Sequence, residues 1–93
     1  MSLTITDACT LADVIRAAQG NQPLARLQDN GEVLGGTARA ICSSPSGGYL
    51  SGDQDVREGF LWVTTQSGWE QWWPIREVVA LVQAGELALN YRV

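Results

Sequence analysis

The sequence contains no histidine and no lysine. Without histidine there is no side chain whose unperturbed pKa lies near neutrality, which excludes Ser-His-Asp and Cys-His relays and histidine-ligated zinc sites. Without lysine there is neither Schiff-base chemistry nor the phosphate-binding lysine of a P-loop. Among the remaining residue types, no candidate nucleophile has a general base at a fixed spacing in the sequence. We therefore expect a protein that is not an enzyme and that uses no cofactor and no metal.

Positive charge is scarce as well. All six positive charges are arginines scattered singly along the chain, and ten carboxylates bring the net charge to −4. Direct binding of nucleic acid depends on clustered lysine and arginine, so the absence of a basic run argues against it. Six of the ten carboxylates lie in residues 47–93, where they favour a partner with a basic surface.

Two cysteines, Cys9 and Cys42, are too few for a disulfide framework and lack C-x-x-C spacing. We interpret them as buried, reduced thiols of a cytoplasmic protein, with a single Cys9–Cys42 disulfide as the alternative. Residues 1–19 show no basic region followed by an apolar core, so no signal peptide is expected, and no apolar run is long enough to span a membrane. The expectation is one cytoplasmic domain over residues 1–93.

Hydrophobic periodicity predicts an α+β domain. Alternating apolar and polar residues indicate strands, apolar residues at i, i+3, i+4 and i+7 indicate helices, and Gly, Pro and Asn mark their ends. In the first half we expect a short strand over 2–6, a helix over 10–19 that opens on a capping box, and strands over 24–28, 32–34 and 37–42. A long flexible loop follows over 43–59 and could hide a short strand at Tyr49-Leu50. In the second half we expect a hairpin of strands 60–65 and 69–74, a helix over 75–84 and a last strand over 86–93.

The turns refine this fold. Asn30-Gly31 indicates a two-residue type I′ turn, in which Asp29 would face Glu32 and repel it. Gly35-Gly36 predicts a bulge or a sharp bend, and Gln66-Ser67-Gly68 predicts a three-residue hairpin turn with a left-handed glycine. The result is a small, strongly bent antiparallel sheet with an N-terminal helix and a second helix before the last strand. Its element order resembles a partly open SH3-like barrel, a fold that hosts many functions.

The tryptophan-rich hairpin over residues 60–74 is the most informative feature. If Thr65 pairs with Trp69, strand alternation defines two faces. One face carries Leu61, Val63, Trp69 and Trp73, and the other carries Phe60, Trp62, Trp72 and Pro74. Both faces are apolar, whereas a surface hairpin normally has one polar face. Either the helix over 75–84 covers the second face, or part of that face is exposed and binds a partner. We expect at least one of Trp62, Trp69 and Trp72 to be partly exposed.

An acidic stretch, Asp53-x-Asp55-x-Arg57-Glu58, is the second candidate. It resembles the start of an EF-hand loop, but Arg57, Glu58 and Thr64 stand where that loop needs an oxygen ligand, a glycine and a glutamate. We therefore expect no calcium binding there. Our interpretation is a solvated loop that could present carboxylates to a basic partner surface.

These features predict a small cytoplasmic module that binds another protein. The residues expected to contact the partner are Phe60, Trp62, Trp69, Trp72, Asp53, Asp55, Arg57 and Glu58. Compact acidic domains of this kind are common in phages and mobile elements, and the charge suits an inhibitor of a host nucleic-acid-handling complex. Two alternatives stay open. One is a small barrel that binds single-stranded nucleic acid by stacking bases on aromatic side chains. The other is a homo-oligomeric structural subunit, such as a homodimer, that buries the second aromatic face across a two-fold axis. No membrane partner is expected.

Overall fold

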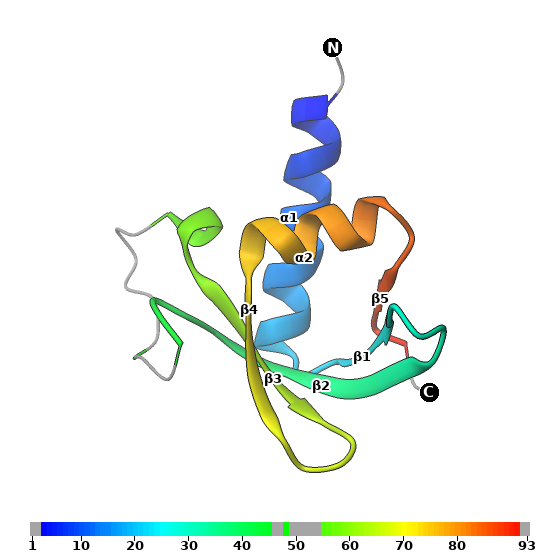
Figure 1. Cartoon of the computed structure of the whole chain (residues 1–93). Helices are drawn as coiled ribbons and strands as arrows, with labels where there is room; N and C mark the ends of the chain where they lie inside the picture. The colour runs from blue at the N-terminus through cyan, green and yellow to red at the C-terminus, as the bar shows by residue number, and fades with distance from the viewer. Residues whose placement is uncertain (1–2, 46–47, 49–54, 92–93) are drawn as a thin grey trace.

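Two helices and five strands account for most of the computed structural model, which describes residues 3–45, 48 and 55–91, with side chains from residue 11 onward (Figure 1). In chain order the elements are α1 (Leu3–Gln19), β1 (Pro23–Leu27), β2 (Val33–Cys42), the short 3₁₀ helix η1 (Val56–Glu58), β3 (Phe60–Thr65), β4 (Glu70–Pro74), α2 (Ile75–Gln83) and β5 (Leu87–Leu89). Neither described helix is both long and apolar enough to cross a membrane.

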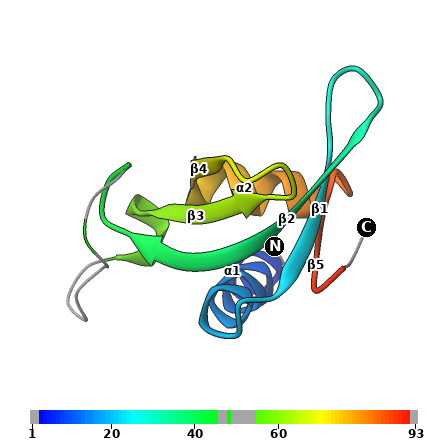
Figure 2. The same cartoon turned by 90° about the horizontal axis from the view of Figure 1, so that it is seen from below.

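The strands form one antiparallel sheet in the order β4-β3-β2-β1-β5. β2 lies in the middle, pairing with β1 along its first half and with β3 along its second, and it curves strongly (Figure 2). The predicted α+β class and the bent antiparallel sheet are thus confirmed. The sheet is open, with β4 and β5 as its edges, so the described strands do not close into the barrel that the element order resembles.

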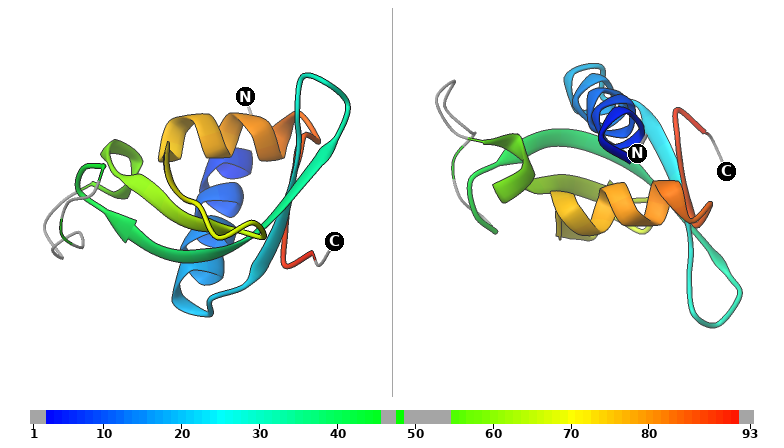
Figure 3. Two further views of the ribbon diagram at one scale, coloured as in Figure 1. Left: turned by 60° about the horizontal axis from the view of Figure 1, so that its bottom comes forward. Right: turned by 90° about the horizontal axis from the view of Figure 1, so that it is seen from above.

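Both helices pack against the same face of the sheet, which we call the inner face; the opposite one is the outer face. α1 lies against β2, and α2 contacts α1 and the edges of the sheet (Figure 3). The buried core comprises Val14, Ala17 and Ala18 of α1, Leu24 of β1, Ala38 of β2, Leu61 and Val63 of β3, Trp73 of β4, Ile75 and Val78 of α2, and Leu87 of β5. Every strand of the sheet therefore contributes to one core on the inner face.

α1 begins at Leu3 and not at Thr10. The strand predicted over residues 2–6 is therefore wrong for residues 3–6, and the supposed capping box lies inside the helix. The alternation that suggested a strand covers only a few residues, whereas the helical repeat of Leu11, Val14 and Ala18 continues back to Ala8. Once a helix is nucleated, each further residue adds a backbone hydrogen bond, so extension prevails.

The β1–β2 hairpin has a three-residue turn and not the predicted two-residue type I′ turn. The amide of Gln28 donates to the carbonyl of Glu32 at 2.8 Å, and the amide of Gly31 donates back to Gln28 at 2.9 Å. Only Gly31 is left-handed, with a φ of 86°, which spares Asn30 an unfavourable conformation. Because Gln28 faces Glu32, the expected repulsion between Asp29 and Glu32 across the turn does not arise.

β2 runs without interruption through its glycine pair, and the bulge lies further along. A Cβ at Gly36 would sit 2.9 Å from the carbonyl oxygen of Thr64, so glycine is needed there for close approach of two strands. The register with β3 shifts between Ala38 and Ala40, which makes Arg39 the extra residue. The predicted irregularity exists, but its position was wrong.

The end of β2 holds a buried thiol. Cys42 is free and only 2% exposed, as predicted. The side chain of Cys9 lies outside the described residues. So do Tyr49-Leu50, where a short strand was possible.

The second helix follows the prediction and the last strand is shorter than predicted. α2 starts directly after Pro74, and Gly85 just beyond its end has a φ of 77°, the left-handed conformation expected at such a position. The strand predicted over 86–93 ends at Leu89. The reason is Asn90, whose φ of 56° turns the chain out of the extended conformation.

Candidate functional site

The turn of the β3–β4 hairpin determines which tryptophans meet. The amide of Thr65 donates to the carbonyl of Trp69 at 2.8 Å, and the amide of Gly68 donates to Thr65 at 3.0 Å. Gly68 has a φ of 92°, so the turn is the predicted three-residue one with a left-handed glycine. The hydroxyl of Thr65 also accepts from the amide of Trp69 at 3.1 Å, which closes the hairpin firmly.

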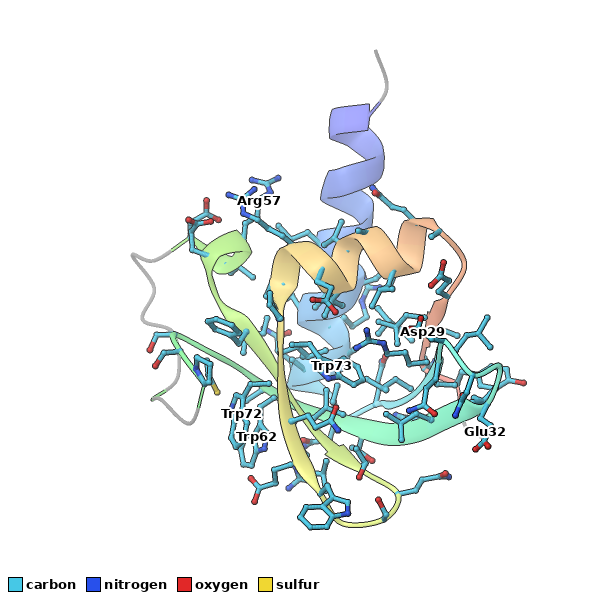
Figure 4. The ribbon with its side chains drawn as sticks, in the orientation of Figure 1. Asp29, Glu32, Arg57, Trp62, Trp72 and Trp73 are labelled. Carbon is cyan, nitrogen blue, oxygen red and sulfur yellow. The ribbon has the colours of Figure 1, made fainter. Side chains whose placement is uncertain are left out.

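Trp62 lies opposite Trp72 in this register, as predicted. Thr65 and Trp69 form a hydrogen-bonded pair, so alternation makes Trp62 and Trp72 a non-hydrogen-bonded pair, the type in which side chains approach most closely. Their ring centroids are 6.3 Å apart and their planes are 6° from parallel, which is an offset stack (Figure 4). The hairpin thus presents two indoles as one stacked pair.

Two polar side chains hold this stack in place. The Nε1 of Trp62 donates to Oε1 of Glu70 at 3.0 Å, which satisfies the indole N–H without water. The guanidinium carbon of Arg39 lies 5.9 Å from the centroid of the Trp62 ring, within the range of a cation–π contact. Arg39 reaches this position because it is the bulge residue of β2, next to the strand position that pairs with Trp62.

α2 does not cover the outer face. Its buried residues, Ile75 and Val78, pack with Trp73 in the core on the inner face. The first of the two predicted alternatives is therefore wrong. The physical reason is that α2 begins directly after β4 and shares the inner face with α1, where its own apolar stripe is buried. Trp62 and Trp72 stay half-buried on the outer face, as the exposure prediction requires.

The four predicted aromatic residues do not form one surface. Phe60 shares the outer face with Trp62 and Trp72 and is half-buried like them. Trp69 lies at the tip of the hairpin, where alternation assigns it to the inner face, and its side chain is 71% exposed because the core does not extend that far. We define the aromatic face by Phe60, Trp62 and Trp72 alone.

The two described carboxylates of the acidic stretch accept hydrogen bonds within the molecule. Asp53 lies outside the described residues. Asp55 caps η1, its Oδ1 accepting from the amide of Arg57 at 3.0 Å. Glu58 accepts two bonds from Arg76 of α2, at 3.0 and 2.7 Å. The hydrogen bond and the charge of Glu58 raise the pKa of Arg76 above its ordinary value. In its described part this loop therefore presents one carboxylate in an ion pair and one that caps η1.

Arg57 is exposed and lies apart from the aromatic face (Figure 4). It borders a cavity of about 210 Å³ that is also lined by Ile75, Val79 and Ala80 of α2. Arg76, which also lines this cavity, is paired with Glu58, whereas no ion pair of the Arg57 guanidinium is present among the described residues. The structure thus divides the described site residues into an aromatic face, an exposed hairpin tip and a loop whose two described carboxylates accept hydrogen bonds within the molecule.

Two contacts of the site were not anticipated from the sequence. Glu70 could have been found, because it lies two positions before Trp72 on the same face of β4. Arg39 could not, since its place beside Trp62 depends on a bulge that shifts the register of β2.

Comparison with known proteins found no matching family model, no similar curated protein and no similar solved structure. The interpretation of this site therefore depends on its geometry alone.

Proposed function

We propose that this protein is a small, non-enzymatic module that binds another protein through the aromatic face. The observation that carries the proposal is the Trp62–Trp72 stack on the outer face, which neither helix covers. Tryptophan is enriched among the residues that dominate binding energy at protein interfaces. A partly exposed pair of indoles on the open face of a sheet is a feature that a partner would stabilise.

The stack is ordered before any partner arrives. The bond to Glu70 and the contact with Arg39 restrict the rotation of Trp62, and Trp62 in turn restricts Trp72. Side-chain ordering normally opposes association, so a surface that is already ordered loses less entropy on binding. This rigidity supports a binding role over a role as loosely packed surface.

The partner we propose has a basic surface, in keeping with the net charge of −4. A protein complex that handles nucleic acid has such a surface, and an acidic module that binds there would act as an inhibitor. We further propose that the chain originates in a phage or mobile element and that it acts in the cytoplasm.

Affinity capture from the native host tests the proposal. The bait is compared with its Trp72→Glu variant, which places a charge on the aromatic face, and with Trp69→Glu as the matched control at the exposed hairpin tip. We expect one protein to be recovered by the bait and by the control but not by the Trp72 variant. Equal recovery by all three baits, with circular dichroism showing all three folded, would contradict the proposal.

Binding of single-stranded nucleic acid is the second candidate, and one observation favours it. The Arg39–Trp62–Trp72 arrangement combines a cation with a stacking platform, as nucleic-acid-binding sheets do. Glu70 lies on the same face and would repel phosphate. A fluorescent oligonucleotide titrated at low salt decides between the two: affinity tighter than about 10 μM that falls steeply with salt would favour nucleic acid. Light scattering on the purified protein tests the homodimer.

A further inference from the structure

The β1–β2 hairpin ends in an exposed apolar pair. Leu27 and Val33 lie opposite each other as the last pair of the β1–β2 ladder, one position before the Gln28–Glu32 pair that closes the turn, and they are 45% and 51% exposed. Alternation places both on the outer face, away from the core residue Leu24. Figures 2 and 3 show that this end of the hairpin projects beyond the helices and the rest of the sheet. No described element covers the pair.

Free negative charge gathers at the same end of the molecule. Most described carboxylates have a partner: Asp13 binds Arg16, Glu58 binds Arg76, Glu77 binds Arg26, Asp55 caps η1 and Glu70 binds Trp62. The side chains of Asp29, Glu32 and Glu86 have none among the described residues. Glu86 belongs to this end because its carbonyl accepts from the amide of Leu27 at 2.8 Å.

The tip holds its shape through its own hydrogen bonds. Besides the two backbone bonds of the turn, Oδ1 of Asn30 accepts from the amide of Glu32 at 2.9 Å. The left-handed Gly31 completes the turn. These bonds order the backbone of the tip, in which Asp29 follows Leu27 by two residues and Glu32 directly precedes Val33. In Figure 4 both carboxylates lie far from Trp62 and Trp72.

We propose that residues 27–33, which we call the acidic finger, insert into an apolar pocket of the partner protein that is bordered by arginine or lysine side chains. The inference rests on the proposed function and specifies the partner's chemistry. Leu27 and Val33 supply the apolar contact, and Asp29 and Glu32 meet the cations. Such a rim also binds phosphate, so the finger would compete with nucleic acid for the partner surface.

The charges on this chain indicate that the partner of the acidic finger is another protein and not a second copy of this chain. Four of the six arginines are already in contact: Arg16, Arg26 and Arg76 with carboxylates, and Arg39 with Trp62. A second copy therefore offers no strongly basic rim in its described part. Nucleic acid is disfavoured as the direct ligand because the carboxylates of the finger would repel its phosphates.

A peptide titration followed by NMR tests the finger. The probe is a synthetic peptide of alternating arginine and leucine, added to the ¹⁵N-labelled full chain. We expect saturable shifts confined to residues 27–33 and their neighbours, and weaker binding at higher salt. An Asp29→Asn, Glu32→Gln double variant, which keeps shape and removes two charges, should lose about tenfold in affinity. Asp13→Asn, a control that removes one carboxylate on α1 away from the finger, should lose less than about twofold.

The remaining outcomes overturn the inference. No saturable binding, shifts centred on the aromatic face, or equal affinity of the double variant would each exclude the finger as a docking element. Shifts on the aromatic face alone would leave the proposed function standing, so the two failures are distinguishable. Concentration-dependent mass in light scattering that disappears in the Asp29→Asn, Glu32→Gln variant would replace the basic partner by a second copy.

Discussion

Replacing Trp69, Trp72 and Trp73 by alanine, one at a time, tests the assignment of the two sheet faces on which the candidate site depends. Trp73 is 5% exposed in the core, its Nε1 donates to Gln71 at 2.8 Å, and the guanidinium carbon of Arg26 lies 4.8 Å from its ring centroid. Removing a buried tryptophan leaves a cavity as well as lost transfer energy, so we expect a loss of about 3–5 kcal/mol in the free energy of unfolding.

The other two tryptophans should cost much less. Trp72 is half-buried, and its replacement by alanine removes the stack with Trp62, worth about 0.5–1.5 kcal/mol, and part of its apolar contact. We expect the free energy of unfolding to fall by about 1–2 kcal/mol in total. Trp69 is 71% exposed, and its replacement should change the free energy of unfolding by less than about 0.5 kcal/mol. The three costs should therefore be clearly ordered, with Trp73 far above the others.

Urea unfolding followed by far-UV circular dichroism measures all three costs. The slope with denaturant should stay constant, so the midpoint alone reports the change in stability. Because a domain of this size has a total stability of about 5–15 kcal/mol, the Trp73 variant would lose a large part of it. A cost for Trp72→Ala equal to that of Trp73→Ala would mean that the outer face is buried, and the candidate site would fall with it.

Two further predictions follow from close contacts and burial. Gly36→Ala should reduce the free energy of unfolding by about 1–3 kcal/mol, because the new Cβ would lie 2.9 Å from the Thr64 carbonyl oxygen. Gly35→Ala should cost less, because the three atoms nearest to its new Cβ all belong to the flexible side chain of Gln66. Equal costs in urea unfolding would contradict this difference. Cys42, at 2% exposure, should react with a water-soluble aromatic disulfide at least about 100-fold more slowly in the folded than in the urea-unfolded protein, in a variant without the other cysteine. Rapid reaction of the folded protein would show that this thiol is accessible.

The features that sequence reasoning predicted correctly are those set by neighbouring residues. Gly68 at the end of a three-residue turn determines the pairing of Thr65 with Trp69, and alternation then brings Trp62 opposite Trp72. The start and end of α2 follow in the same way from proline and glycine at its two ends. Each of these inferences needs only residues that are close in the chain.

The predictions that were wrong concern segments whose sequence is compatible with two local conformations. Asn30-Gly31 is compatible with a type I′ turn and with a longer turn in which glycine alone is left-handed, and hydrogen bonds from Gln28 and Glu32 select the second. Residues 3–6 alternate as a strand would, yet no described strand pairs with them, and the helix that follows extends through them. The residue pattern of a short segment does not distinguish two such conformations reliably, because their free energies differ by little.

By itself the sequence determined the α+β class, the hairpin that pairs the tryptophans, and the absence of any side chain for histidine or lysine chemistry. Only the tertiary structure decided which aromatic face is covered and which charges are free. The reason is that burial and ion pairing depend on residues distant in the chain: α2 shares the inner face with α1, and Arg26 reaches Glu77 while Arg76 reaches Glu58. These pairs neutralise carboxylates of the second half, where the sequence had located the excess charge. Asp29 and Glu32 of the first hairpin have no such partner in the part of the chain that the structure describes.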